Sequence, residues 1–267
     1  MSPKALSRLV LIPLALGGLL RLYYVRSTAA LYHVSGDGEE GYYETASALL
    51  QLHTLSPGIP DTHPSAFRGP IYPVFIALVE SPFAHPHPRQ VRMAQVALGL
   101  LEIAAAFALG RFILSPLAGL LAALWIAVDL NLVLSAASLN VHAFYGFCML
   151  ALAVAAVLWV ETRSVASTVV FGWLLAITLL CRSAHYPLPL LFLAAYLLWW
   201  RFPDRRWKVV GVMAASTALF LSPMVARNAV QFKRFILLDT YKGSYIFLQS
   251  TMGGYVNTTV GQAMDSA

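Results

Sequence analysis

The chain has 267 residues, of which 59% are hydrophobic and 11% are charged, with a mean hydropathy of +0.69 and a net charge of +6. A soluble domain carries roughly 25% charged residues, so this composition excludes an ordinary soluble domain. The arginines gather at the ends of apolar runs, as in helical membrane proteins, which disfavours a function in nucleic-acid binding. The two cysteines both lie inside apolar runs, so they indicate neither a disulfide framework nor a CxxC metal pattern.

The apolar runs predict an all-α, polytopic helical membrane protein with about seven transmembrane helices. The runs are continuous rather than alternating, which favours helices over a barrel. We expect spans at about 6–24, 91–114, 117–135, 143–160, 165–180, 188–200 and 209–226.

Two stretches outside these spans complete the expected organisation. The apolar stretch 70–83 is too short to cross a bilayer, so we expect it to be interfacial or re-entrant. The transmembrane module would then cover residues 1–227, with an outer loop at 25–90 that carries interfacial helices. Residues 228–267 would form an outward-facing C-terminal segment.

Basic residues in the short loops predict the orientation. An N-terminus in the cytoplasm places Arg111, Arg163 and the basic cluster at 201–208 on the cytoplasmic side, which agrees with the positive-inside rule. The C-terminus would lie outside, and the protein is expected in a bacterial inner membrane. The first span could instead be a cleaved signal peptide, but the arginine and tyrosines at 21–24 resemble an interfacial anchor and favour a retained span.

The stretch GDGEEGYYETASALL (36–50) concentrates four of the twelve acidic residues. Asp37 as N-cap with Glu40 at the third helical position forms a capping-box pattern, so a helix is expected to follow Asp37. The spacing of Tyr42, Ala46 and Leu49 predicts an amphipathic helix on the outer membrane surface. The same Asp37 carboxylate could be exposed for proton abstraction, and the two interpretations are compatible.

Further segments follow the acidic stretch in a characteristic order. They are HPSAFRGPIYPVFIAL (63–78), VRMAQ (91–95), LLCRSAHYPLPLL (179–191) and the stretch 222–249. Together with the register of Tyr42, Ala46 and Leu49, they resemble the GT-C type of membrane glycosyltransferase. The resemblance is to the branch that contains protein O-mannosyltransferases and aminoarabinose transferases.

This resemblance implies transfer of a sugar from a polyprenyl-phosphate donor to an acceptor hydroxyl of a glycan, lipid or protein at the outer face. It implies that Asp37 acts as general base. Glu39 and Glu40 could share this role, because Asp37 lies one residue further from Tyr42 than is usual in the family.

The resemblance also implies that arginines bind the lipid phosphate, because the guanidinium fork matches phosphate oxygens. The substrate-binding residues it indicates are Arg68, Tyr72, Arg92, His142, Arg182, Arg227 and Asn228. We expect no metal cofactor, since the branch resembles metal-independent members, although the acidic cluster could hold a divalent ion.

Three polar features inside or beside the spans keep alternatives open. Glu102 and Asp129 lie in apolar runs, where an ionisable residue is by default a functional hypothesis, but either could be paired with an arginine or protonated. His85 and His87 form only a weak metal-binding pattern.

A second function remains open, namely a catalytically inactive membrane subunit of the same fold that acts as a partner or scaffold. The outer segment SLNVHAF (138–144) has Asn140 and His142 where the family usually has an acidic residue. The chain is also shorter than many family members, so it could be a minimal member, a truncated chain or such a subunit. A transporter is disfavoured because the sequence shows no convincing internal repeat.

Overall fold

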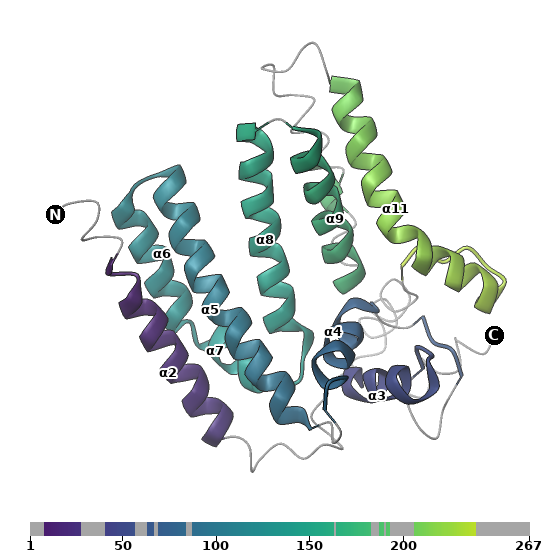
Figure 1. The fold of residues 1–267 in the computed structure, drawn as a ribbon, viewed down its shortest axis with the longest axis horizontal. Helices are drawn as coiled ribbons and strands as arrows, with labels where there is room; N and C mark the ends of the chain where they lie inside the picture. Colours follow the sequence, from purple (N-terminus) through teal and green to yellow (C-terminus); the bar gives the residue numbers. More distant parts are fainter. Residues whose placement is uncertain are drawn as a thin grey trace, which may run out of the picture. The chain divides into compact units, whose positions relative to one another are not determined.

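The computed structural model describes residues 8–27, 41–56, 63–66, 69–83, 87–162, 164–182, 187–189, 191–192 and 206–238. The regular elements in these ranges are all helices, which confirms the predicted all-α class (Figure 1). The chain divides into two compact units: unit 1 comprises residues 1–52 and 72–154, and unit 2 comprises residues 53–71 and 155–267.

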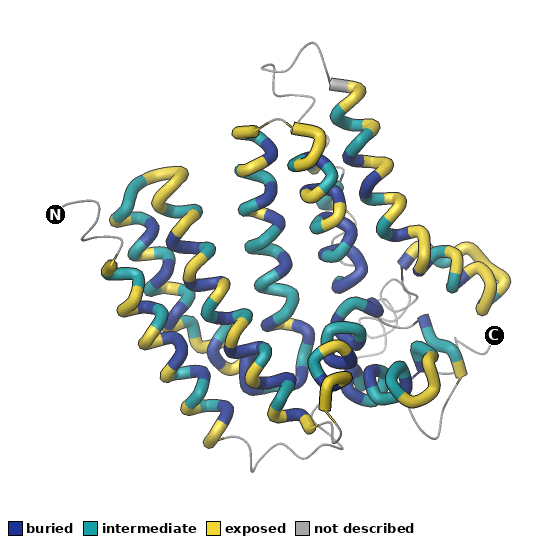
Figure 2. Tube along the Cα trace, viewed as in Figure 1, coloured by how far each residue is buried: buried dark blue, intermediate teal, exposed yellow. Residues whose placement is uncertain are grey.

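Unit 1 contains most of the helices. They are α2 (Leu11–Ser27), α3 (Tyr42–Leu52), α4 (Ile71–Glu80), α5 (Pro88–Ile113), α6 (Pro116–Val128), α7 (Leu130–Ala137) and the first part of α8 (Val141–Thr162). Helix α5 packs against α6, α2 and α7. Its buried positions, among them Val91, Gln95, Glu102 and Ile103, recur three or four residues apart, so one stripe of the helix faces its neighbours (Figure 2).

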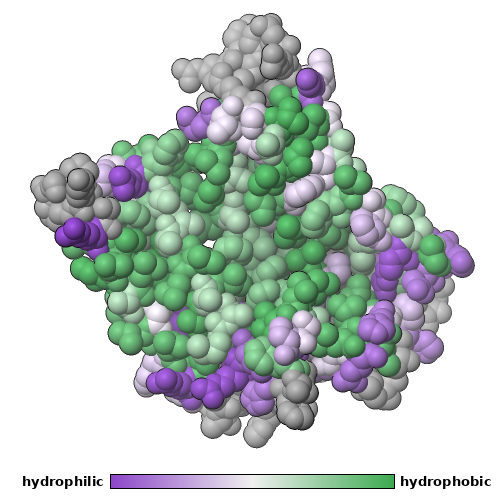
Figure 3. All heavy atoms as spheres, viewed as in Figure 1, coloured by the Kyte–Doolittle hydropathy of each residue, from purple (hydrophilic) through white to green (hydrophobic). Residues whose placement is uncertain are grey.

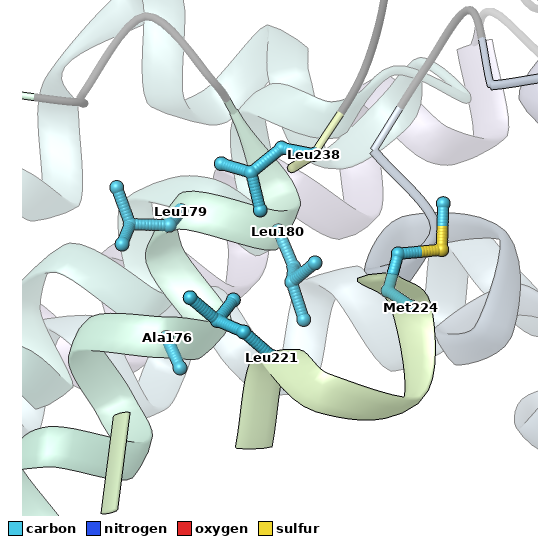
Figure 4. Packing of buried hydrophobic residues seen from close by; sticks show 6 residues of the cluster. All are labelled: Ala176, Leu179, Leu180, Leu221, Met224 and Leu238. Carbon is cyan, nitrogen blue, oxygen red and sulfur yellow. The ribbon is translucent and has the colours of Figure 1, made fainter. Parts of the chain in front are cut away.

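Unit 2 is built around the packing of α9 (Val165–Cys181) against α11 (Arg206–Phe232). The apolar cluster between them is formed by Ala176, Leu179, Leu180, Leu221, Met224 and Leu238 (Figure 4). Close approach of the two helices is possible because Gly172 has no side chain: a Cβ there would lie 2.1 Å from the Ser216 hydroxyl. Thr217 also donates to the Gly172 carbonyl at 3.1 Å.

Three described helices are long and apolar enough to cross a membrane: α5, α8 and residues Trp207–Phe232 of α11. A fourth span is present if α6 and α7, which meet at a 50° bend, are counted as one broken span. Apolar side chains cover much of the visible surface of these helices (Figure 3). The protein is therefore an integral membrane protein.

The remaining three of the seven predicted spans are not found as long apolar helices in the described ranges. Helix α2 has 17 residues, and α9 is a shorter apolar helix of the same length. The expected span at 188–200 falls mostly outside the described residues. The short apolar stretch at 70–83 forms α4, too short to cross a bilayer, as predicted.

The predicted span at 117–135 is interrupted at Asp129. This residue is not a free charge within a continuous helix: it has φ −59° and ψ 117°, and its carboxylate accepts from the Leu132 N–H at 3.0 Å as the N-cap of α7. A break in an apolar helix leaves carbonyl groups without intrahelical donors, which is costly in lipid.

Arg21 of α2 supplies the donors that this break requires. The side chain is fully buried, and its guanidinium donates to the carbonyls of Ile126 (3.1 Å) and Ala127 (3.3 Å), near the C-terminal end of α6. Gly99 makes room for it, since a Cβ there would lie 2.4 Å from Arg21 Nε. Helix α2 is thus an integral part of unit 1.

Helix α3 begins later than the capping-box pattern indicated. Gly41 precedes it with φ 64°, a left-handed conformation that a continuous helix from Asp37 would not contain. The Gly41 carbonyl accepts from both the backbone and the side chain of Thr45, at 3.1 and 2.9 Å. The helix therefore begins at Tyr42, not directly after Asp37.

Two other local features follow from single residues. His87 is a helix cap: its side chain accepts from Arg89 N–H, and its own N–H donates to the Gln90 side chain, which completes a capping box.

In α11, Pro223 cannot donate to the Leu219 carbonyl, and the Ser222 hydroxyl donates to that carbonyl instead at 2.8 Å. Figure 1 shows that α11 bends in its second half, which contains this proline.

Candidate functional site

A buried polar junction in unit 1 contains Tyr72, one of the predicted substrate-binding residues. Tyr72 lies in the first turn of α4, is 0% exposed, and its hydroxyl donates to Gln95 Oε1 of α5. The amide nitrogen of Gln95 in turn donates to the carbonyls of Ser135, Ala136 and Ser138, at 3.2, 3.2 and 2.7 Å. Tyr72 therefore connects α4 with α5 and with the link between α7 and α8.

Aromatic rings surround Tyr72 on several sides. Its ring contacts Tyr42 of α3 edge-on, with centroids 5.1 Å apart, and stacks on Phe75 at 6.0 Å. Phe144 of α8 lies 6.0 Å from Tyr72 and 4.7 Å from Phe75. Because the ring is enclosed and the hydroxyl is bonded, Tyr72 exposes no group that could contact a substrate in this structure.

Arg92 and His142 lie near this junction in different environments. Arg92 precedes Gln95 by one turn of α5 and is 4% exposed. His142 is exposed in the first turn of α8, and its backbone N–H donates to Asn140 Oδ1 at 3.0 Å. The Asn140 amide donates to the Ser138 hydroxyl at 2.7 Å, so the segment 138–142 forms a hydrogen-bonded turn at the start of α8.

A contact that the sequence analysis missed joins α3 to α4. The Tyr43 hydroxyl donates to Glu80 Oε1 at 2.8 Å, and Glu80, the last residue of α4, is 0% exposed. Burial raises the pKa of Glu80 above its ordinary value of 4.5 and is the main cause that raises the pKa of Tyr43 above 10. Glu80 is the only charged residue in the stretch 70–83, which is the sequence signal that could have indicated it.

In unit 2, Arg227 binds backbone carbonyl groups. Its guanidinium donates to the carbonyl of Ser65 (2.8 Å), to that of Leu55 (3.0 Å) and to the side chain of Asn228 (3.0 Å), and it lies 5.3 Å from the Phe232 ring centroid. Ser65 N–H donates to the Leu55 carbonyl at 2.9 Å, so Arg227 closes a loop whose two ends already meet.

Asn228 completes this arrangement. It is 0% exposed, and its amide donates to the carbonyls of Ile236 (3.1 Å) and Leu238 (3.4 Å). Arg227 and Asn228 thus hold two loops, at 55–65 and 236–238, against the end of α11.

Arg182 lies at the C-terminal end of α9, where its backbone N–H donates to the Thr178 carbonyl at 3.0 Å. Gly69 lies against the same turn: a Cβ there would be 2.0 Å from the Leu180 carbonyl oxygen and 3.0 Å from that of Cys181. Unit 2 therefore places the residue that follows Arg68 in the chain beside the turn that ends at Arg182.

The other predicted site residues, Asp37, Glu39, Glu40 and Arg68, lie outside the described residues. In the part of the chain that is described, no three histidine, cysteine or acidic side chains lie together as a metal-ion site requires. Glu102 in α5 is 4% exposed, and its Oε1 has no hydrogen-bond partner among the described residues. Gly146 of α8 leaves room for it, since a Cβ there would lie 2.7 Å from Oε1.

Comparison with known proteins identifies one matching family. The family model described as dolichyl-phosphate-mannose-protein mannosyltransferase matches residues 62–226, more than half of the chain. The matched range includes Arg68, Tyr72, Arg92, His142 and Arg182; it begins after the acidic stretch at 36–50 and ends just before Arg227. No curated protein and no solved structure matches the chain.

Proposed function

Because the chain belongs to the dolichyl-phosphate-mannose-protein mannosyltransferase family, we propose that it is a membrane glycosyltransferase that transfers a sugar from a polyprenyl-phosphate donor to an acceptor hydroxyl. The family match over residues 62–226 is the observation that carries this proposal. The long apolar helices α5, α8 and α11 agree with it, because a lipid-linked donor is presented at a membrane.

In the proposed reaction, the acceptor oxygen attacks the anomeric carbon of the sugar. A bond forms between these two atoms, and the bond from the anomeric carbon to the phosphate oxygen breaks. The acceptor's proton passes to the carboxylate of Asp37, with Glu39 and Glu40 beside it in the sequence. The polyprenyl phosphate leaves with the electron pair of the broken bond and needs positive charge around it.

We assign the phosphate to Arg68 and Arg182, which both belong to unit 2. Arg227 has a different task in this proposal, because both terminal nitrogens of its guanidinium already donate, mainly to backbone carbonyls. It holds the loop at 55–65 that leads toward Arg68. We assign a sugar or acceptor hydroxyl to His142, which is exposed at the start of α8.

The proposed topology places this chemistry at the outer face of a bacterial inner membrane. The tight turn between α5 and α6, which follows Arg111, would be cytoplasmic together with the N-terminus. The link between α7 and α8 at 138–140, which carries no basic residue, would then lie outside, and so would the C-terminus.

The inactive-partner alternative is favoured by one specific observation. In the segment between α7 and α8, Asn140 stands where the family usually has an acidic residue, and its side chain is used in a local turn with Ser138 and His142. A chain that lacks this carboxylate could retain the fold and bind a catalytic subunit without transferring sugar itself.

Transfer by the purified chain separates the two functions. The chain is reconstituted in proteoliposomes with a series of polyprenyl-phosphate sugars and with glycan, lipid and peptide acceptors. We expect transfer by the wild type and a loss of about 100-fold or more in Asp37→Asn, the usual contribution of a general base. Asp129→Asn is the matched control, because asparagine retains the helix cap of α7 and should retain transfer.

The arginine assignment has its own pair of variants. Arg182→Ala should weaken donor binding, whereas Arg111→Ala, an exposed arginine at the last turn of α5, should not. Wild-type transfer by Asp37→Asn would reject the base assignment. A wild type that binds donor but transfers to none of the acceptors would support the inactive partner.

A further inference from the structure

The Tyr43–Glu80 contact is unusual for a chain with only twelve acidic residues. Glu80 is fully buried, and its second oxygen, Oε2, has no hydrogen-bond partner among the described residues. A buried carboxylate with one hydrogen bond is a poor contributor to stability, because the loss of hydration outweighs what a single bond returns. A hydrogen bond to a carboxylate is nevertheless short and strongly directional, which suits it to fix one group relative to another.

A second contact fixes the same turn of α3. Tyr42, next to Tyr43, packs edge-on against Tyr72 at 5.1 Å and 86°. Tyr72 and Glu80 lie eight residues apart in α4, which corresponds to about 12 Å along a helix. Two contacts separated by that distance determine the direction of the first turn of α3 as well as its position.

Helix α4 is itself held by the rest of unit 1. The Tyr72 hydroxyl donates to Gln95 of α5, and Gln95 donates to the carbonyls at the link between α7 and α8. The first turn of α3 is therefore connected through α4 to the helices of the bundle by an unbroken series of side-chain contacts.

The acidic residues 37–40 directly precede the first turn of α3 in the sequence. Glu40 directly precedes Gly41, and Asp37 precedes Tyr43 by six residues. Six residues of extended chain span at most about 21 Å, so a fixed Tyr43 limits the region that the Asp37 carboxylate can reach.

We propose that Tyr43 and Glu80 are positioning residues for the transfer reaction: their hydrogen bond holds the start of α3 so that the acidic stretch before it meets the bound donor and acceptor. This inference rests on the proposed function, in which Asp37 is the base. It adds two residues that touch neither substrate and act through the placement of the acidic stretch.

The kinetic test uses the full chain in proteoliposomes. Tyr43→Phe removes the donor, and Glu80→Leu removes the acceptor. Each should lower kcat by about tenfold or more, as expected for a misplaced catalytic group, while the KM for the donor lipid stays the same. The double variant should be no slower than either single variant, because both changes remove one interaction.

A conservative variant and a matched control separate positioning from general damage. Glu80→Gln retains an oxygen that accepts from Tyr43, so it should restore kcat to near the wild-type value. Tyr23→Phe changes an exposed tyrosine of α2 and should have no effect. Wild-type kcat in Tyr43→Phe, or a loss in Glu80→Gln equal to that in Glu80→Leu, would overturn the proposal.

Hydrogen exchange distinguishes failure of this inference from failure of the proposed function. In Tyr43→Phe and Glu80→Leu, backbone amides in a peptide that covers α3 should exchange faster than in the wild type, by about tenfold, and those in Glu80→Gln should not. Unchanged exchange in the first two variants would refute the anchoring, whatever the activity. Faster exchange in these two variants, combined with a wild-type chain that transfers no sugar, would refute the proposed function alone.

Discussion

Replacement of Arg21 by methionine tests how unit 1 accommodates a broken helix in an apolar environment. Methionine occupies a similar volume to the aliphatic part of arginine but donates no hydrogen bond. In Arg21→Met, the carbonyls of Ile126 and Ala127 lose the donors that now lie 3.1 and 3.3 Å away. The third acceptor, the Gly17 carbonyl, lies within α2 itself, so its loss matters less.

The magnitude follows from these two interhelical bonds. Hydrogen bonds between membrane helices contribute on average about 0.6 kcal/mol and at most about 1.7 kcal/mol, and a buried acceptor left without a donor adds a further penalty of about 1 kcal/mol or more. We therefore expect Arg21→Met to lower the free energy of unfolding by about 2–4 kcal/mol.

A second change should suppress much of this loss. Asp129→Ala removes the cap of α7, which alone costs about 1 kcal/mol. It also permits residue 129 to become helical, so that the N–H groups of Leu130 and Asn131 can bond to the carbonyls that Arg21 now serves. The double variant Arg21→Met/Asp129→Ala should lose less free energy of unfolding than the sum of the losses in the two single variants.

The assay is equilibrium unfolding by sodium dodecyl sulfate in mixed micelles, followed by circular dichroism at 222 nm. This wavelength reports the helices that dominate the described residues, and roughly 2 kcal/mol is a clear shift of an unfolding midpoint. An Arg21→Met chain as stable as the wild type, or strictly additive losses in the double variant, would refute the account of the break given above.

Three further outcomes are expected from the same structure. Gly110→Ala should destabilise unit 1 by about 1–3 kcal/mol because its Cβ would lie 2.8 Å from the Gly119 Cα, whereas Gly211→Ala in α11, where nothing lies within 4 Å, should be neutral or stabilising in the same assay. Because burial raises the pKa of Glu80 in the folded state, the native chain binds its proton more tightly than the unfolded chain, so the contribution of Glu80 to stability should decline as pH rises from about 4.5 through the folded pKa. In thermal scans at a series of pH values, the wild type should therefore lose stability relative to Glu80→Gln over that range, and a constant difference between the two chains would contradict the argument. Arg227→Met should release the two backbone carbonyls that Arg227 binds, and limited proteolysis should then cleave the loop before Arg68 sooner than in the wild type. Equal cleavage rates would count against the proposed role of Arg227 in holding this loop.

Long-range side-chain contacts explain most of the difference between the predicted and the observed structure. Continuous apolar runs predicted α5, α8, α9 and α11 to within a few residues over most of their length, because composition over some twenty residues determines whether a helix suits lipid. The run at 117–135 gave no sign that it would break at Asp129. The break depends on Arg21, more than a hundred residues earlier, and no local pattern contains that contact.

The sequence indicated candidate residues for the site, but not the contacts that these residues make. Motif order singled out Arg182 and His142, and both lie within the matched range, but their roles stay predictions. Tyr72 was predicted to bind substrate, but its burial against Gln95 was not foreseen, because the pairing joins two helices. The Glu80 contact was missed for the same reason: a lone acid in an apolar stretch indicates a partner but does not identify it.

The hydrogen bonds from Arg21 to α6 have a consequence for how the protein inserts into a membrane during synthesis. Helix α2 leaves the ribosome before α6, and the acceptors Ile126 and Ala127 are synthesised 105 and 106 residues after Arg21. Until then the guanidinium lacks these two acceptors, and an arginine within a lone inserted helix costs up to about 2.5–3.5 kcal/mol. In the proposed topology, α2 would therefore remain at the translocon, or with its arginine near the lipid head groups, until α6 and α7 are made. Stable insertion of α2 would then depend on a segment synthesised about a hundred residues later.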